Sequence, residues 1–509
     1  PREAVAEFSE NSDKFPGINI FVKPERTYTK GSLASHILGY ASKISSEEYK
    51  TRKDTYDQND LIGKTGIEYV FEEYLKGKKG VKQIDMAVDG TITGEYTAEE
   101  AQPGADIVLT IDANLQKVTE DALAANMQKI RSGGFGKSYN AISESCVVMN
   151  VKTGEILAMA SYPGYDPSDF IGGISNEKWN NYVNDASKPL VNKAMQTSYS
   201  PGSIFKMVTA IAGLESGVIT PKTIINDTGV YTKYEKYGTR MNCWYYTDYH
   251  RGHGQLNVIG AIEKSCNYFF YETADRMQID TLDKYAKYFG LGTKTGVELR
   301  DETSGVLASK ETKAKMHPDA SYWAPGDTLN AAIGQGDNEF SPLQMAKYIS
   351  MLANGGNKID VSIIKTIRNA DGTEESRDNI NKFVKQKLGL SDDDSENLNI
   401  NQENLKVVLE GMRSVTEEGT AASIFKDFEI AVGGKTGSAE APGNKVNAWF
   451  AGFAPFDNPE IAVVVMAENG GHGYYTADAV KQIMREYFGM NLQNVTEDVT
   501  ASPYTETLR

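Results

Sequence analysis

The sequence has little of what marks several common protein classes. Only three of its 509 residues are cysteine, which is too few for a disulfide framework, and the odd number leaves at least one thiol unpaired. It contains no run of about 18 apolar residues that could form a membrane span. Acidic residues outnumber basic ones by 69 to 53, and the net charge of −16 argues against nucleic acid as a partner.

Three short polar motifs follow one another along the chain. Ser203–Lys206 reads Ser-Ile-Phe-Lys, Ser265–Asn267 reads Ser-Cys-Asn, and Lys435–Gly437 reads Lys-Thr-Gly. Together they offer a serine nucleophile, a lysine base, a second serine that can move protons, and a cationic strand edge that can hold a carboxylate. These are the parts of a serine acyl-transfer enzyme that has no catalytic histidine.

The first motif stands where an apolar helix is expected to begin. Ser200–Gly202 contains a proline and a glycine and predicts a turn, and a largely apolar run then continues to Gly217. Lys206 lies three residues after Ser203 and therefore on the same face of the helix. Burial lowers the pKa of a lysine, and a neutral amine can take the proton of a serine. A second Ser-x-x-Lys string, Ser175–Lys178, has no apolar run after it.

The other two motifs are placed by their neighbours. Residues 428–434 are expected to form a strand that leads into Lys435, with further antiparallel strands at 448–454 and 461–466. Asn257 is expected to begin a helix before the second motif. The alternative for the second motif is a helix whose Ser265 and Asn267 merely face solvent. The third motif is not specific by itself, because the chain contains three further Lys-Thr-Gly strings.

These residues resemble those of class B penicillin-binding proteins, which are monofunctional peptidoglycan D,D-transpeptidases. The resemblance is closest to the elongation-type members and covers nearly the whole chain. The matching segments are residues 201–206, 265–267 and 434–440, then 334–336 with 341–344, and in the N-terminal part 26–28, 34–40 and 63–68.

The resemblance implies a multidomain α+β protein. We expect a penicillin-binding transpeptidase fold, with an antiparallel sheet flanked by helices and an all-helical subdomain, on an N-terminal α+β pedestal. We place the non-catalytic, dimerisation-like pedestal at residues 1–103, the transpeptidase domain at 104–495 and a C-terminal tail at 496–509.

The resemblance also implies the roles of the motif residues. Ser203 would attack a stem peptide and form an acyl-enzyme, with Lys206 as general base. Ser265 would relay a proton to the leaving D-alanine, and Asn267 would hydrogen-bond the substrate. Lys435 would supply positive charge.

The strand around the third motif would bind the substrate. Thr436 and Ser438 would grip the terminal carboxylate, and Gly437 would let the substrate backbone lie close. The implied partners are peptidoglycan stem peptides, β-lactam antibiotics and a SEDS-type glycan polymerase. The implied place is the extracytoplasmic face of the cell membrane, through an N-terminal anchor that this sequence lacks.

Two alternatives to a transpeptidase stay open. A D,D-carboxypeptidase or β-lactamase-type hydrolase would use the same parts, but it needs a group that activates water, and the sequence shows no clear glutamate motif for that purpose. An inactive scaffold of the cell-wall machinery would keep the fold without the reaction.

A separate group of residues suits a metal. Cys243, Asp248, His250 and His253 stand close together and include two of only five histidines. Four such side chains predict a tetrahedral, structural zinc site with no position left for substrate. The alternative is a loop in which they hydrogen-bond locally. No cofactor is expected for catalysis.

Overall fold

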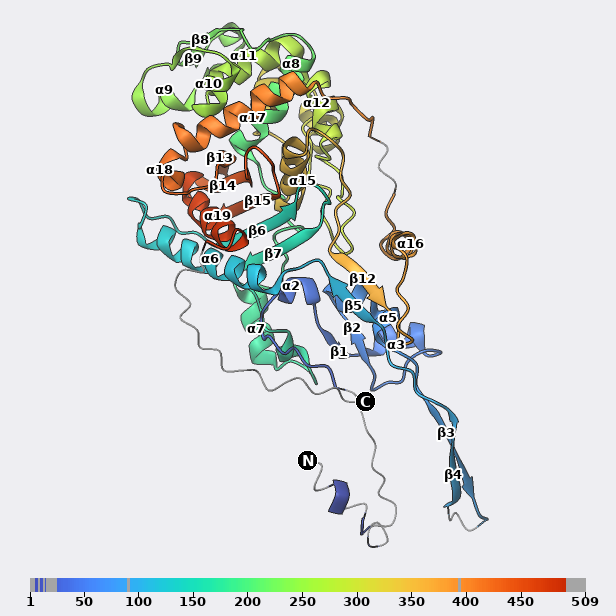
Figure 1. The fold of residues 1–509 in the computed structure, drawn as a ribbon. Coiled ribbons are helices and arrows are strands. Elements are labelled where there is room, and N and C mark those ends of the chain that lie inside the picture. Colours follow the sequence, from blue (N-terminus) through green and yellow to red (C-terminus); the bar gives the residue numbers. More distant parts are fainter. Residues whose placement is uncertain are drawn as a thin grey trace.

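The computed structural model describes residues 5–7, 10–11, 14, 25–88, 92–391 and 395–490. The tail predicted at residues 496–509 lies outside the described residues. Figure 1 shows a mainly helical part at the top, a sheet in the middle and the pedestal below, from which the β3–β4 hairpin extends. No helix among the described residues is long and apolar enough to cross a bilayer.

An antiparallel five-stranded sheet forms the centre of the catalytic part. Its strands lie in the order β13, β14, β15, β6, β7, so the third motif occupies an edge strand. β6, β14 and β15 are almost wholly buried, as expected for a sheet covered on both faces. The bounds are β6 Ser143–Asn150, β7 Ile156–Tyr162, β13 Gly433–Ala441, β14 Lys445–Ala454 and β15 Ile461–Glu468.

Helices cover both faces of this sheet. α6 (Ala113–Ser132) and α19 (Tyr474–Tyr487) pack on one face, and α15 (Pro342–Ala353) packs on the other. Asp112 caps the N-terminus of α6, because its side chain accepts from the N–H groups of Asn114 and Leu115. α17 (Gln402–Glu417) lies against β13, the strand that carries the third motif.

The helical part is built around α8. This helix spans Lys206–Glu215, and every residue from Lys206 to Leu214 is buried. The other elements of this part are β8 Ile225–Asp227, β9 Val230–Tyr231, β10 Met241–Asn242, α9 Trp244–Tyr249, β11 Gly254–Leu256, α10 Val258–Glu263, α11 Asn267–Met277, α12 Ile279–Tyr288, α13 Lys310–Met316 and α14 Pro325–Ala332. α18 (Ala422–Phe425) lies beside α17 and α19.

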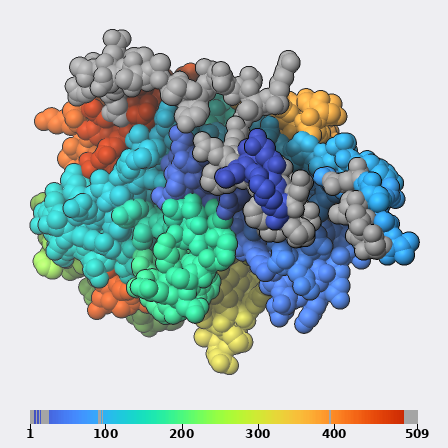
Figure 2. Space-filling model, turned by 90° about the horizontal axis from the view of Figure 1, so that it is seen from below, coloured from blue at the N-terminus to red at the C-terminus, as the bar shows by residue number. Residues whose placement is uncertain are grey.

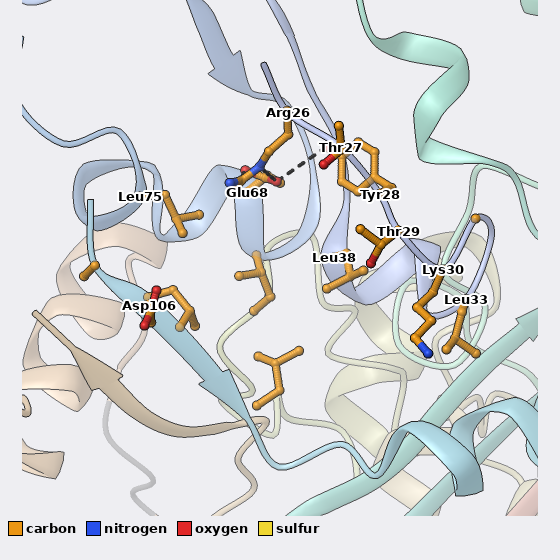
Figure 3. Close-up of a pocket in the computed structure, with 15 residues that line it drawn as sticks. Arg26, Thr27, Tyr28, Thr29, Lys30, Leu33, Leu38, Glu68, Leu75 and Asp106 are labelled. Atoms are coloured by element: carbon orange, nitrogen blue, oxygen red, sulfur yellow. Dashed lines mark hydrogen bonds and ion pairs between the residues drawn. The ribbon is translucent and has the colours of Figure 1, made fainter. Parts of the chain in front are cut away.

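The pedestal is made of short elements. They are α2 Ser35–Leu38, β1 Ala41–Lys43, α3 Ser46–Arg52, β2 Leu61–Gly63, α4 Gly66–Val70, α5 Glu72–Leu75, β3 Val81–Met86 and β4 Ile92–Glu99. β5 (Asp106–Leu109) pairs with β12 (Ile364–Arg368), and α16 (Arg377–Leu388) follows β12. A cavity of about 500 Å³ lies where β5 meets the pedestal, and Figure 3 shows Arg26 and Glu68 facing each other at its wall.

Aromatic contacts join the pedestal to the segment that carries α7 (Asn176–Asn184). The rings of Tyr40 and Phe170 stack with centroids 3.8 Å apart, and His36 Nε2 lies 2.8 Å from the carbonyl oxygen of Pro189. Figure 2 shows the green α7 segment standing beside the blue pedestal. These contacts join the pedestal directly to the catalytic part.

Three predictions about the contexts of the motifs are settled by the structure. The strand predicted at residues 428–434 is wrong for most of its length, because Phe428 ends a turn that follows α18 and β13 begins only at Gly433. The rival Ser175–Lys178 string has a structural role, since Ser175 caps α7 by accepting from the Lys178 N–H. The strands predicted at 448–454 and 461–466 are confirmed.

Candidate active site

Ser203 lies in a short 3₁₀ turn that leads directly into α8. The turn spans Gly202–Phe205, and Gly202 has a φ of 56°, which favours glycine. The Gly202 N–H donates to the Gly334 carbonyl at 2.9 Å, which fixes the turn from the far side. Ser203 is half-buried, and its hydroxyl has no hydrogen-bond partner among the described residues, so its Oγ is free to meet a ligand.

Lys206 is fully buried one turn further on. Its Nζ donates to the Ser265 carbonyl at 2.7 Å, to Ser265 Oγ at 3.2 Å and to Asn267 Oδ1 at 2.6 Å. Burial lowers the pKa of this lysine to about 8. A lysine with that pKa is neutral in a useful fraction of molecules near neutral pH and can act there as a base.

Ser265 sits between the two lysines of the site. It stands in the link between α10 and α11 and has a left-handed φ of 53°. Its side chain is buried, with the residue only 6% exposed, so the alternative in which Ser265 merely faces solvent is wrong. Lys435 Nζ donates to Ser265 Oγ at 2.9 Å and to the Thr436 carbonyl at 3.0 Å. Burial, and then the charge of Lys206, hold the pKa of Lys435 well below its usual range.

Strand β13 packs against the turn that carries Ser203. A side chain at Gly437 would come within 2.7 Å of the Pro201 carbonyl oxygen, so only glycine allows this approach. Ser438 is exposed, and its Oγ accepts from the Gly473 N–H at 2.9 Å. The structure thus brings the eight residues predicted for catalysis and substrate binding into one region around the Ser203 turn, the α10–α11 link and β13.

Two neighbours of the site carry no motif. Thr420 Oγ1 lies 2.7 Å from Thr436 Oγ1, and Trp244 Nε1 donates to the Ser265 carbonyl at 3.0 Å. The Ser265 carbonyl therefore accepts from both Trp244 and Lys206. Neither position could be predicted, because a lone threonine or tryptophan in a sequence has no pattern that points to a distant strand.

Comparison with known proteins decides the family. Residues 144–489 match the penicillin binding protein transpeptidase domain, and residues 1–109 match the penicillin-binding protein dimerisation domain. The chain belongs to the penicillin-binding protein family. The boundary that we place at residue 103 stays a prediction.

Relatives of this penicillin-binding protein include two curated enzymes named peptidoglycan D,D-transpeptidase MrdA. The one from Acinetobacter baumannii is 32% identical over 94% of this chain and 68% of its own length. The one from Escherichia coli K12 is 31% identical over 94% of this chain and 74% of its own length.

Solved structures confirm the fold of this penicillin-binding protein. Pseudomonas aeruginosa PBP2 in complex with WCK 5153 has a TM-score of 0.74 at 31% identity and covers 92% of both chains. A chain from a peptidoglycan synthase complex has a TM-score of 0.79 at 30% identity, covering 98% of this chain and 82% of its own. PBP2 from Helicobacter pylori, bound to MreC, has a TM-score of 0.77 at 26% identity, covering 96% and 84%.

A cluster of metal-type ligands lies behind the second motif of this penicillin-binding protein. One potential ligand atom from each of Asp227, Cys243, His253 and Cys266 lies within 4.8 Å of the others. His253 Nδ1 lies 2.7 Å from Asp227 Oδ2, and Cys266 Sγ lies 3.3 Å from the same oxygen. His253 Nε2 is buried without a hydrogen-bond partner among the described residues. Two thiols, an imidazole and a carboxylate fit the tetrahedral preference of zinc.

The cluster corrects the ligand set that the sequence predicts. Cys243 and His253 belong to it, but Asp248 and His250 do not. Both of these residues are exposed at the C-terminal end of α9, whereas Cys243 is buried at its N-terminal cap. The pairing of β8 with β11 instead brings Asp227 next to His253.

Proposed function

We propose that this protein is a peptidoglycan D,D-transpeptidase that crosslinks stem peptides through an acyl-enzyme on Ser203. The observation that carries the proposal is that two buried lysine amines donate to Ser265 Oγ. The hydroxyl of Ser203, in the turn that leads to Lys206, has no hydrogen-bond partner among the described residues. The names of the MrdA relatives give the reaction class that these groups would serve.

In the first half of the reaction, Ser203 Oγ attacks the carbonyl of the penultimate D-alanine while neutral Lys206 accepts the serine proton. The backbone N–H groups of Ser203 and Ser438 hold the oxyanion that forms. Ser265 passes a proton to the departing D-alanine nitrogen, which leaves as a neutral amine. The acyl group is then joined to Ser203 as an ester.

The substrate is held by the edge strand. Its terminal carboxylate binds to the hydroxyls of Thr436 and Ser438 in the field of Lys435. Asn267 Oδ1 is occupied by Lys206, so its amide N–H₂ donates to the substrate backbone. An amine of a second stem peptide finally displaces Ser203 and forms the crosslink.

A labelled penicillin tests this proposal. We expect one adduct per chain that persists for hours, that peptide mapping places on Ser203, and that is absent in Ser203→Ala. Adduct turnover within minutes would support the hydrolase alternative. A stable fold with no adduct at all, together with intact cellular function of Ser203→Ala, would support the scaffold alternative.

The same proposal extends to place and partners. We infer that the protein works at the extracytoplasmic face of the cell membrane, beside a SEDS-type glycan polymerase, and that β-lactams are its inhibitors. Support comes from relatives solved in a peptidoglycan synthase complex for polymerization and crosslinking and with MreC. Co-purification of a polymerase with this chain, retained in Ser203→Ala, would test the partner independently of catalysis.

We further propose that Asp227, Cys243, His253 and Cys266 hold a structural zinc ion. All four coordination positions would be filled by side chains, so the ion would contribute stability and take no part in the reaction. Cys266 precedes Asn267 in the second motif, so the ion would fix the link that presents Ser265. Metal analysis of protein purified without added zinc is expected to find about one zinc per chain, and a metal-free protein of full stability would contradict the site.

A further inference from the structure

A cleft of about 560 Å³ lies beside the site described above and has no role in the proposed acylation. We propose that this cleft binds the acceptor, a peptide that carries a free primary amine together with carboxylates. The proposal rests on the proposed transpeptidase function and adds the place where the second substrate binds. The lining residues that carry the argument are Trp244, Arg251, Glu263, Lys264, Glu418 and Thr420.

Two residues that line the cleft contact residues of the catalytic motifs. Trp244 donates to the carbonyl of Ser265, the residue whose hydroxyl joins the two lysines. Thr420 Oγ1 lies 2.7 Å from Thr436 Oγ1. The walls are held together at Gly419, where a Cβ would come within 2.7 Å of the Glu263 carbonyl oxygen. A ligand in the cleft is therefore one residue away from the second motif, through Trp244, and one residue away from the third, through Thr420.

The position beside Thr436 separates this cleft from the donor peptide. In the proposed function, Thr436 binds the terminal carboxylate of the donor, and the donor has no atoms beyond that group. Thr420, which lines the cleft, is thus the neighbour of the residue that would bind the end of the donor. The leaving D-alanine departs from this end, and the incoming amine takes the place of its nitrogen on the acyl carbon, so we expect the amine to enter from the same end. The acceptor thus has to approach Ser203 from the side on which the cleft lies.

The charges of the cleft fit a ligand that carries both signs. Glu263 and Glu418 supply carboxylates, and Lys264 and Arg251 supply cations. Within the part of the chain that the structure describes, none of these four forms an ion pair, and Arg251 donates only to the Tyr245 hydroxyl at 2.9 Å. Two carboxylates attract an ammonium group, and two cations attract the carboxylates of the same peptide. A purely anionic acceptor would leave the two carboxylates without an opposite charge, and an uncharged acceptor would leave all four groups without one.

The chemical step is balanced without any further reagent. The bound ammonium first loses one proton to water and becomes a neutral amine. Its nitrogen then attacks the ester carbonyl, forming the C–N bond of the new amide and breaking the C–O bond to Ser203. The second nitrogen proton returns to Ser203 Oγ through Ser265 and Lys206, which regenerates the hydroxyl.

The partition of the acyl-enzyme between water and amine tests the proposal. The donor is a D-alanyl thioester peptide, and the acceptor is a tripeptide that ends in a diamino acid with a free side-chain amine. We expect the double variant Glu263→Gln/Glu418→Gln to keep the rate of Ser203 acylation within about twofold and to lose about tenfold in transfer to the amine relative to hydrolysis. The matched control is Glu429→Gln, an exposed carboxylate outside the cleft, which should change neither rate. Unchanged partition in the double variant would overturn the proposal.

Binding to penicillin-acylated protein gives a second measurement that does not depend on turnover. The wild-type adduct should bind the tripeptide. It should bind the same tripeptide about tenfold more weakly when the side-chain amine is acetylated. The adduct of the double variant should also bind the free tripeptide about tenfold more weakly than the wild-type adduct does. Equal binding of the acetylated peptide, or no binding to wild type at millimolar concentration, would contradict the acceptor site. Failure of wild type to form a Ser203 adduct would instead contradict the proposed function itself.

Discussion

Lys206 and Lys435 converge on one oxygen atom. Their Nζ atoms lie 3.2 and 2.9 Å from Ser265 Oγ, and both side chains are fully buried. Burial disfavours the ammonium form of both lysines, and the charge of Lys206 acts on Lys435 in the same direction. The pKa values of both lysines are therefore lowered, and the arrangement favours a state in which one amine is neutral and can receive a proton.

Replacing Lys206 by methionine separates its chemical role from its packing role. Methionine has a similar length and suits the apolar surroundings of α8. We expect the second-order rate of acylation by penicillin to fall by about 10²- to 10⁴-fold, because the proton of Ser203 then has no base. Thermal unfolding should stay within a few degrees of wild type, since methionine fills the space of the lysine side chain and no carboxylate loses a partner. Acylation within tenfold of wild type, in a protein that unfolds normally, would rule out Lys206 as the base.

The pH dependence of acylation follows from the lowered pKa of Lys206, which is about 8. The base has to be neutral, so the rate should rise with pH through 6 and 7 and level off above about 8. Stopped-flow measurement of adduct formation between pH 6 and 9 checks this profile. The residual rate of Lys206→Met should lack the rise, and the same profile in that variant would assign the titration to another group.

The Thr436 hydroxyl is predicted to act through the carboxylate of the ligand. We expect Thr436→Val to lower acylation by penicillin about tenfold, whereas Thr436→Ser, which keeps the hydroxyl, should remain near wild type. The decisive comparison uses penicillin methyl ester, which has no carboxylate. Wild type and Thr436→Val should react with the ester at similar rates. A tenfold gap that persists with the ester would mean that Thr436 supports the strand and not the ligand.

Buried Glu144 is predicted to limit stability at high pH. Its Oε1 accepts from Asn126 Nδ2 at 3.0 Å, while its Oε2 has no partner among the described residues. Burial raises the pKa of Glu144 well above its ordinary value of 4.5. Above pH 4.5 the unfolded chain releases this proton while the folded protein retains it, so the free energy of unfolding falls as pH rises.

Glu144→Gln keeps the amide contact and cannot ionise. We expect its unfolding temperature to match that of wild type near pH 4.5 and to exceed it by about 2 °C or more at pH 8. Glu429→Gln, which replaces an exposed carboxylate, is the control and should follow wild type at both pH values. A Glu144→Gln variant that is less stable at pH 8 would show that the carboxylate is ionised and stabilising.

Metal content can distinguish the ligand set given by the structure from the set that the sequence predicts. Asp227→Asn and Cys266→Ser should lose the bound zinc and unfold at a lower temperature. The double variant Asp248→Asn/His250→Ala, which replaces two exposed residues outside the cluster, should keep the zinc content of wild type. Metal analysis after gel filtration checks both. Loss of zinc only in Asp248→Asn/His250→Ala would instead support the ligand set that the sequence predicts.

Local sequence patterns predicted the elements that hold the motifs. The turn at residues 200–202 and the apolar run after it gave the Ser203 turn and α8, since a buried helix is marked by residues that are apolar on every face. The strand before Lys435 was wrong because residues 428–432 are apolar enough for a strand but are used to close the turn after α18. Short apolar runs do not distinguish these two uses.

The sequence by itself determined the chemical groups of this penicillin-binding protein, their order along the chain, and the face that Ser203 shares with Lys206. Only the tertiary structure decided what each group touches. Cys266 reads as a spacer within the second motif, yet the left-handed turn at Ser265 directs it toward Asp227. The choice of ligands and the cleft beside Thr420 depend on contacts between distant segments, and these arise from the packing of β13, α10 and the β8–β11 pair, which no local spacing records.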